Sequence, residues 1–190
     1  CKTDHFQKIV SSNDYDLIDT LIDVYDEPFA DSSALPTYRV CELASSQVTV
    51  ALSGDGADEL MSGYRHHLMH LNEEKIRSLI PQSIRTALFG TLGKLYPKAD
   101  WAPRFLRAKS TFQGLAMDSV SAYFQTVSQN NDSTRSKLFS EDFKNNLNGF
   151  NAVNIFHKHA ENAPNKDPQA LIQYLDAKTY LIGDILTKVD

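Results

Sequence analysis

The stretch "VTVALSGDGADEL", Val48 to Leu60, joins a short apolar run to a loop rich in glycine and acidic residues. The run at residues 48–52 is β-branched and apolar on both parities, which is typical of a strand covered on both faces of a parallel sheet. After the loop, apolar residues recur at helical spacing up to residue 71, so we predict a helix over residues 57–71. Strand, glycine loop and helix in this order form half of a βαβ unit.

The loop itself suits a ligand that carries phosphate. In an open parallel sheet, ligands bind in the crevice outside the carboxyl ends of the strands, where this loop is expected to lie. Gly54 and Gly56 let a ligand approach the main chain closely, and Ser53 adds a hydroxyl donor. The free N–H groups at the start of the following helix favour a phosphate oxygen.

The acids of the loop, Asp55, Asp58 and Glu59, predict a cation as well. A carboxylate beside a phosphate is unfavourable unless a cation separates them, and Mg²⁺ is the usual bridge. The residues alone leave open a plain glycine-rich turn, in which Asp58 and Glu59 only complement the dipole of a helix start. A β-hairpin is disfavoured because "ELMSGYRHHL" has helical spacing, and the ligand spacing excludes an EF-hand.

Beyond residue 72 the strand signals end and helical patterns follow one another. They cover residues 73–80, 83–96, 119–129 and 151–160, and a last helix starts with Asp167 as cap and Pro168 in the first turn. Before the loop, we predict helices at residues 14–25 and from about residue 34, and a weaker strand at residues 5–10. We therefore predict part of an α/β layer over residues 1–71 and a helical lobe over residues 72–190.

Composition excludes several classes of protein. The 190 residues are 42% hydrophobic and 23% charged with a net charge of −5, which fits a globular domain and argues against nucleic acid as the main partner. No apolar run reaches the ~18 residues that span a bilayer, residues 1–10 lack the basic and then apolar layout of a signal peptide, and the two cysteines suggest no disulfide framework, so we expect a cytoplasmic protein. The chain starts at Cys1 without an initiator Met, and we expect it to be part of a longer polypeptide.

Three blocks of the sequence resemble the asparagine synthetase family of glutamine-dependent ligases. The segment "VALSGDGADELMSGY" (residues 50–64) is similar to the second signature loop of that family. The segments "DEPFADSSALPTY" (26–38) and "YLIGDILTKVD" (180–190) are similar to an earlier block and to a later helix, in the same order. The resemblance implies an adenine nucleotide alpha hydrolase-like (ATP-pyrophosphatase) fold: an α/β parallel-sheet layer followed by a mostly α-helical lobe.

The resemblance also implies an activity. Such enzymes adenylate the side-chain carboxylate of aspartate with ATP, and ammonia released from glutamine in a separate N-terminal glutaminase domain attacks the adenylate. The expected cofactors are ATP and Mg²⁺, the expected partners are aspartate and that ammonia, and neither nucleic acid nor a membrane is expected. A homodimer is one oligomeric state open to such a chain.

By resemblance, Ser53, Gly54 and Gly56 are assigned to nucleotide binding. Asp55 matches the acidic position associated with forming the β-aspartyl adenylate, and it is expected to be catalytic with Glu59, which partners the metal ligand. Asp58 matches the carboxylate that holds Mg²⁺ against the pyrophosphate. Metal and backbone donors stabilise the negative charge that adenylation gathers on phosphate oxygens.

The family's first phosphate loop, S-G-G-x-D-S, does not occur in residues 1–190, and neither does the glutaminase domain, whose nucleophile Cys1 does not match. We therefore expect this chain to be inactive alone. At residues 57, 61 and 62 it departs from the family pattern, with consequences expected for packing only. Alternatives are a related amidotransferase or β-lactam-synthetase-like ligase acting on another carboxylate, or a non-catalytic module of the same fold.

Other groups are interpreted as structural. His66 and His70 have the i, i+4 spacing of a metal pair without an evident third ligand, so we interpret His66, His67 and His70 as a solvated or intersubunit face. Lys188 matches a family position near the active site, but a helix salt bridge with Asp184 explains it equally well.

Two further sets complete the structural interpretations. Asp190, like Lys188, matches a family position, and capping around Pro28 is preferred over a paired-acid site at residues 26, 27 and 31. The helical-lobe core is expected to take in the aromatic residues Trp101, Phe105, Phe112, Tyr123 and Phe124.

Overall fold

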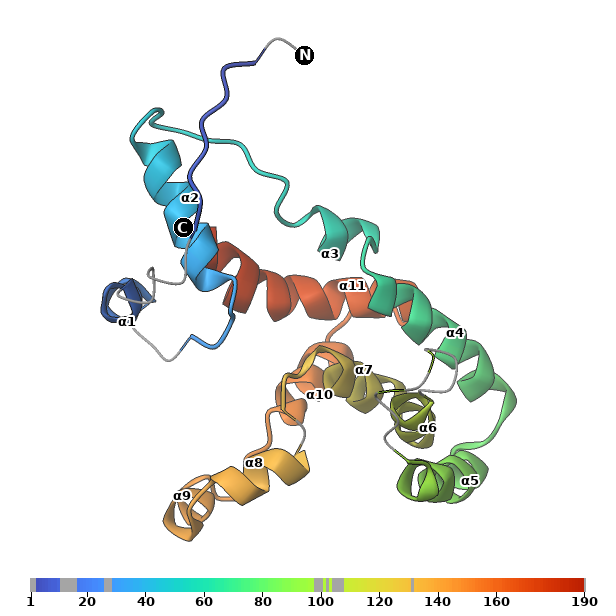
Figure 1. The fold of residues 1–190 in the computed structure, drawn as a ribbon. Coiled ribbons are helices and arrows are strands. Elements are labelled where there is room, and N and C mark those ends of the chain that lie inside the picture. Colours follow the sequence, from blue (N-terminus) through green and yellow to red (C-terminus); the bar gives the residue numbers. More distant parts are fainter. Residues whose placement is uncertain are drawn as a thin grey trace.

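The computed structural model describes residues 3–10, 17–25, 29–97, 101, 103, 108–130 and 132–189 (Figure 1). Within these ranges the regular structure is helical, and no strand forms. None of the helices in the described ranges has the length and apolar character needed to cross a membrane. The helices are α1 (Ile18–Tyr25), α2 (Ala34–Ser45), α3 (Ala57–Met61), α4 (Arg65–Leu79), α5 (Gln82–Leu95), α6 (Lys109–Ala116), α7 (Ser119–Val127), α8 (Asp132–Leu138), α9 (Glu141–Asn146), α10 (Val153–Glu161), α11 (Pro168–Lys178), the π-helix η3 (Leu181–Leu186) and α12 (Thr187–Val189).

The strands predicted at residues 48–52 and 5–10 do not form in the described ranges. Both segments run as irregular chain, and Val50 and Leu52 are 80% and 99% exposed. A strand is stable only where a neighbouring strand pairs with its backbone, and the described residues offer none. The exposure of such apolar side chains marks a surface that fits burial against another element.

The helix predicted over residues 57–71 is two helices. Helix α3 ends at Met61, its C-cap Ser62 adopts a left-handed conformation with φ 57°, and α4 begins at Arg65. A Cβ atom at Gly63 would lie 2.0 Å from Oδ1 of Asp58 and 3.2 Å from its Cα, so a larger residue here would displace the Asp58 side chain. The predicted domain boundary at residue 71 falls inside helix α4, which runs from Arg65 to Leu79.

The other helical patterns are confirmed by α2, α5, α7, α10 and α11, and α1 occupies residues 18–25 of its predicted range. Asp167 caps α11 as predicted, since its side chain accepts hydrogen bonds from the backbone of Gln169 and Ala170, and Pro168 follows in the first turn. Helix α11 ends at Lys178, and a π-helical segment occupies residues 181–186.

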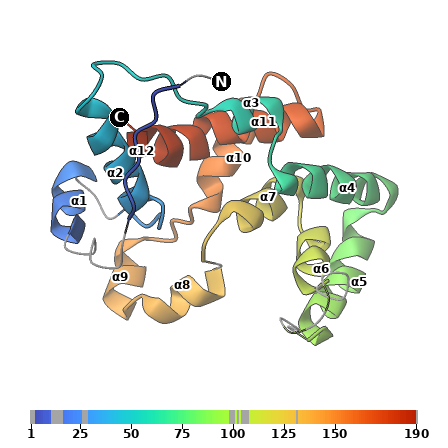
Figure 2. The same ribbon diagram turned by 45° about the horizontal axis from the view of Figure 1, so that its top comes forward.

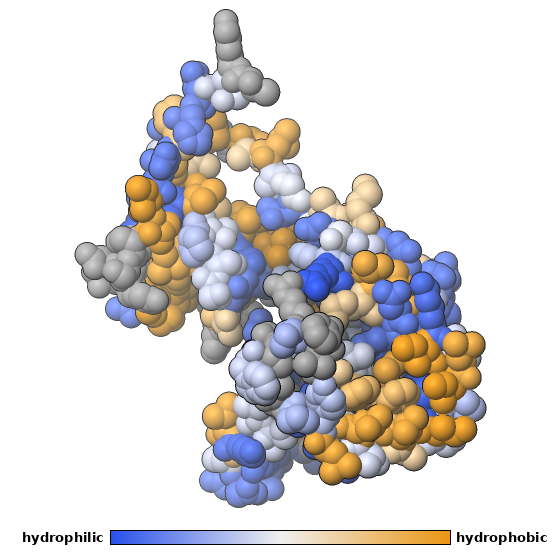
Figure 3. Space-filling view, turned by 45° about the vertical axis from the view of Figure 1, so that its right-hand side comes forward, coloured by the Kyte–Doolittle hydropathy of each residue, from blue (hydrophilic) through white to orange (hydrophobic). Residues whose placement is uncertain are grey.

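Helices α5 and α6 form an antiparallel pair held by an arginine. The guanidinium of Arg85 donates to the carbonyl oxygens of Leu115 and Met117, at 2.6 and 2.9 Å. The outer face of this pair carries exposed apolar residues such as Ile84 and Leu88. Figure 3 shows apolar side chains gathered on the face over α5 and α6.

Helix α11 lies at the centre of the molecule, with α3 and α4 along one side and α7 and α10 along the other (Figures 1 and 2). The core cluster joins α7, α10 and α11 through Tyr123, Phe156, Ala160, Ala163, Leu171, Ile172 and Leu175. Of the predicted core aromatics, Tyr123 is fully buried and Phe124 packs against this cluster.

Phe112 packs on another aromatic group of the α5–α6 pair, with its ring 6.1 Å from that of Phe89. Trp101 is 88% exposed, so its assignment to the core is wrong for the described residues. Phe105 lies outside the described residues.

Candidate functional site

The signature loop is exposed at its start and anchored at its end. Ser53, Gly54 and Asp55 are exposed, whereas Gly56 is buried. Gly56 has φ 88°, a left-handed conformation that side chains disfavour, and a Cβ atom there would touch Cδ1 of Leu181 at 3.5 Å. The loop thus turns into α3 at Gly56, against the π-helical segment.

Helix α3 is tied to α11 by amide side chains. Nε2 of Gln173 donates to the carbonyl oxygen of Leu60 at 2.5 Å, and Nε2 of Gln169 donates to Oγ of Ser62 at 3.3 Å. These contacts fix the backbone that carries Asp58 and Glu59. The acidic loop is therefore positioned by the helical lobe.

The predicted acidic residues separate into two kinds. Asp55 and Asp58 are exposed and have no hydrogen bond or ion pair with any described residue. Glu59 is 1% exposed, and its Oε1 accepts a hydrogen bond from the hydroxyl of Tyr64 at 2.5 Å. Free carboxylate oxygens are the ligands that Mg²⁺ prefers, so Asp55 and Asp58 fit this ion, whereas Glu59 faces the interior of the protein.

Tyr64 connects the loop to a buried polar cluster. Its ring stacks on His66 with centroids 4.9 Å apart and meets the edge of His67 at 5.3 Å. Burial raises the pKa of Tyr64, and its hydrogen bond to Glu59 raises it further. The phenol therefore remains a proton donor at neutral pH.

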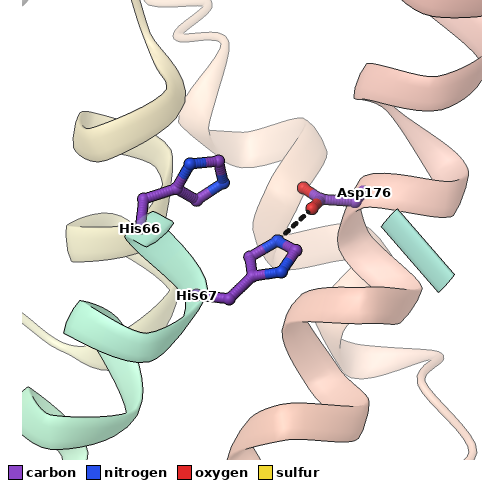
Figure 4. A group of neighbouring side chains, drawn as sticks. All are labelled: His66, His67 and Asp176. Carbon is purple, nitrogen blue, oxygen red and sulfur yellow. Dashed lines mark hydrogen bonds and ion pairs between the residues drawn. The ribbon is translucent and has the colours of Figure 1, made fainter. Parts of the chain in front are cut away.

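The cluster consists of His67, Tyr123 and Asp176, from α4, α7 and α11 (Figure 4 draws His67 and Asp176). Nε2 of His67 lies 2.7 Å from Oδ2 of Asp176 and 3.2 Å from the Tyr123 hydroxyl, which donates to Oδ1 of Asp176 at 2.5 Å. Burial raises the pKa of Asp176, although hydrogen bonds from Tyr123 and His67 lower it. Burial and the Asp176 charge raise the pKa of Tyr123.

His66 brings a third ligand-capable group to the cluster. The donor atoms of His66, His67 and Asp176 lie within 4.8 Å of one another, and two imidazoles with a carboxylate are zinc ligands. However, both oxygens of Asp176 already accept hydrogen bonds, and Nδ1 of His67 has no partner in the described residues. A metal-bound histidine normally donates from its other nitrogen, so the contacts fit a hydrogen-bonded cluster better.

The interpretation of the histidines as a solvated face is wrong for His67 and His70, which are 0% and 2% exposed. Burial and the nearby charge of Arg77 lower the pKa of His70 to about 4. The helical spacing gave no sign of this, because α4 packs against α6, α7 and α11 instead of exposing one face.

Lys188 has more partners than the predicted helix salt bridge. Its Nζ lies 3.6 Å from Oδ1 of Asp184, but it also donates to Oδ2 of Asp31 and, at 3.0 Å, to Oγ of Ser33. Asp31 in turn accepts hydrogen bonds from the backbone and hydroxyl of Ser33, at 2.9 and 2.7 Å.

Asp31 thus bonds Ser33, the residue before α2, and pairs with Lys188 of α12, while α2 has no side-chain cap; the predicted capping around Pro28 lies outside the described residues. Although burial raises the pKa of Asp31, the hydrogen bonds from Lys188 and Ser33 hold it at about 2. Residues 26–28 and Asp190 lie outside the described residues.

Sequence reasoning missed Tyr64, Tyr123 and Asp176 as members of a polar cluster. One signal was present: Asp176 directly follows the core residue Leu175 in α11, so a carboxylate stands beside the apolar positions of a central helix. A charged group there requires buried partners. Its partners come from elements far away in the sequence.

Comparisons with known proteins show that the chain is similar to asparagine synthetases. A family model described as asparagine synthase matches residues 1–190. A putative asparagine synthetase (glutamine-hydrolyzing) 2 of Methanocaldococcus jannaschii is 46% identical over 85 residues, which are 44% of this chain and 16% of that protein.

Two relatives match almost end to end. Asparagine synthetase (glutamine-hydrolyzing) 1 of Bacillus subtilis is 27% identical over 98% of this chain and 28% of its own length. A putative asparagine synthetase (glutamine-hydrolyzing) of Mycobacterium bovis is 27% identical over 98% of this chain and 27% of its own length. The chain thus spans little more than a quarter of the length of these two relatives. No solved structure matches.

Proposed function

Because the chain belongs to the asparagine synthase family, we propose that it forms part of an ATP-dependent ligase that converts aspartate to asparagine with ammonia from glutamine. The relatives named above are glutamine-hydrolyzing asparagine synthetases, and this is the basis for the proposed substrates. The glutaminase reaction belongs to a part of the full-length polypeptide outside residues 1–190.

The proposed reaction has two steps. A side-chain carboxylate oxygen of aspartate attacks the α-phosphorus of ATP. The bond from this phosphorus to the oxygen that bridges it to the β-phosphorus breaks, and pyrophosphate leaves. Ammonia then attacks the activated carbonyl carbon, AMP leaves, and the nitrogen loses a proton. Mg²⁺ supplies charge neutralisation at the departing pyrophosphate.

The observation that carries this proposal is the pair of free carboxylates beside an exposed glycine. Asp55 and Asp58 have no partner among the described residues and lie in the same turn as the exposed Gly54. We assign Asp58 to Mg²⁺, Asp55 to the adenylation step, and Ser53, Gly54 and Gly56 to the nucleotide. Glu59 supports Asp58 from the interior.

We also propose that residues 48–52 add a strand to a parallel sheet of the adenine nucleotide alpha hydrolase type. Val50 and Leu52 are exposed in the described residues and fit burial by such a layer. In that arrangement the loop at residues 53–56 leaves the carboxyl end of a strand, where nucleotides bind in open α/β sheets.

The test is aspartate-dependent exchange of radiolabelled pyrophosphate into ATP by the full-length protein. Asp58→Asn keeps the size of the side chain but removes its charge, and we expect weaker Mg·ATP binding with an unchanged melting temperature. Asp142→Asn, at an exposed position of α9, is the matched control and should leave exchange unchanged.

Two results would contradict the proposal. Exchange with another carboxylic acid but not with aspartate would exclude asparagine formation and favour a related ligase. Unchanged affinity for Mg·ATP in Asp58→Asn would refute the metal role of this residue.

A further inference from the structure

The carboxylate of Glu59 is buried beside the exposed loop and has a single donor. Glu59 is 1% exposed, and its one hydrogen bond among the described residues comes from the hydroxyl of Tyr64. A buried carboxylate without donors is strongly destabilising, so this side chain stays inside only while the Tyr64 hydroxyl remains in place. Tyr64 therefore anchors α3 from the side of α4, in addition to Gln169 and Gln173 on α11.

Tyr64 is held by aromatic contacts on several sides. Its ring stacks on His66 and meets His67 and Tyr180 edge-on, with the Tyr180 centroid 6.1 Å away. Aromatic contacts of this kind restrict a ring to one orientation. The hydroxyl of Tyr64 is thus aimed at Glu59 by its neighbours.

The ring of His67 is in turn fixed from two other helices. Asp176 on α11 holds its Nε2 at 2.7 Å, and Tyr123 on α7 bonds both the imidazole and the same carboxylate. Figure 4 shows His66 and His67 on α4 facing Asp176 across the helix interface. A continuous series of contacts therefore runs from the core of the lobe to the acidic loop.

We infer that Tyr64 is a positioning residue: supported by the His67–Tyr123–Asp176 cluster, it holds Glu59, and with it the helix that carries Asp58, in a fixed position. The consequence for Mg·ATP rests on the function proposed above. The positioning itself does not, because it concerns only contacts within the protein.

The first measurement is hydrogen–deuterium exchange of the full-length protein with Tyr64→Phe, which removes the hydroxyl and keeps the ring. Loss of a hydrogen bond to a charged group predicts exchange at residues 57–61 that is about 10-fold faster or more, with α10 unchanged. Tyr174→Phe is the matched control, because the Tyr174 hydroxyl has no hydrogen bond among the described residues. It should leave exchange at residues 57–61 as in the wild type.

The second measurement separates positioning from general stability. In pyrophosphate exchange, Tyr64→Phe should require about 10-fold more Mg²⁺ for half-maximal rate, with a smaller change in kcat. Glu59→Gln in the Tyr64→Phe background should recover most of the protection at residues 57–61, since a buried amide needs its partner less than a buried carboxylate does. If Tyr64→Phe does not fold, Glu59→Gln alone should speed exchange about threefold in the same segment, because the Tyr64 hydroxyl bonds a neutral amide less strongly than a carboxylate.

Each result decides a separate question. Unchanged exchange at residues 57–61 in Tyr64→Phe, or in Glu59→Gln if the first variant does not fold, overturns the inference whatever the catalytic result. Absence of pyrophosphate exchange in the wild type overturns the proposed function, while hydrogen exchange still decides the positioning role. Stoichiometric Zn²⁺ binding in equilibrium dialysis that is lost in His67→Gln would overturn the hydrogen-bonded cluster and make it a metal site.

Discussion

Lys188 links the end of the described chain to the start of α2, and its removal gives a sharp test of the fold. The side chain is 8% exposed and its ammonium contacts Asp31, Ser33 and Asp184. Lys188→Met keeps the length of the apolar stem and removes the charge. Asp31 and Asp184 are then left close together without a cation.

The size of the effect follows from the burial of the partners. An exposed ion pair contributes at most about 1 kcal/mol, whereas a hydrogen bond to a charged group contributes about 1.5–3 kcal/mol. Asp31 is 26% exposed, between these cases, so we expect Lys188→Met to lower the free energy of unfolding by about 2 kcal/mol. Lys144→Met is the control, since its pair with Glu141 is exposed, and we expect a loss below about 0.5 kcal/mol.

The pH dependence has a defined sign. The pKa of Asp31 is about 2 in the folded protein and 3.8 ordinarily, so the pair stabilises the fold above about pH 4. This stabilisation is lost as the pH falls through the folded value. The difference between wild type and Lys188→Met should therefore close between about pH 4 and pH 2.

The assay is urea unfolding followed by far-ultraviolet circular dichroism, as a double-mutant cycle with Asp31→Asn. We expect a coupling energy of at least about 1 kcal/mol between the two positions. Additivity of the two changes within about 0.3 kcal/mol would refute the reasoning.

Three more changes test other parts of the structure. Gly56→Ala should cost about 1–2 kcal/mol in thermal unfolding because of the left-handed backbone, whereas Gly54→Ala, with no atom within 4 Å of its Cβ position, should cost less than about 0.5 kcal/mol. His70, whose pKa is lowered from 6.5 to about 4, stabilises the fold above pH 6.5 and loses this as the pH falls toward 4; His70→Gln should therefore flatten urea stability across that range. Arg85→Met should cost about 2–3 kcal/mol in thermal unfolding, because it leaves buried carbonyl oxygens without a charged donor.

Each of these changes has a result that contradicts its premise. Equal melting temperatures for Gly56→Ala and Gly54→Ala would mean that the turn into α3 is not left-handed. If the urea stability of His70→Gln had the same pH profile as that of the wild type, the imidazole of His70 would be exposed to solvent in the wild-type protein. An Arg85→Met protein with the melting temperature of the wild type would show that the α5–α6 pair does not depend on its arginine.

Local patterns in the sequence predicted much of the helical lobe. Apolar spacing predicted α5, α7, α10 and α11, and the Asp167–Pro168 start of α11 was predicted from two adjacent residues. Caps and helical periodicity involve groups within a few residues of one another, so they can be recognised without knowing the fold. The break at Ser62 was not recognised, because the apolar spacing continues across it.

By itself, the sequence determined that a glycine-rich loop at residues 53–56 precedes a helix with an acidic first turn, and it determined the family to which the chain belongs. Only the tertiary structure decided that Glu59 is buried while Asp55 and Asp58 remain free. The reason is that a carboxylate can be buried only where hydrogen-bond donors reach it and other side chains hold those donors in place. For Glu59 these lead through Tyr64 to His67 and then to Asp176, 109 residues further along the chain, and only folding brings such distant groups together.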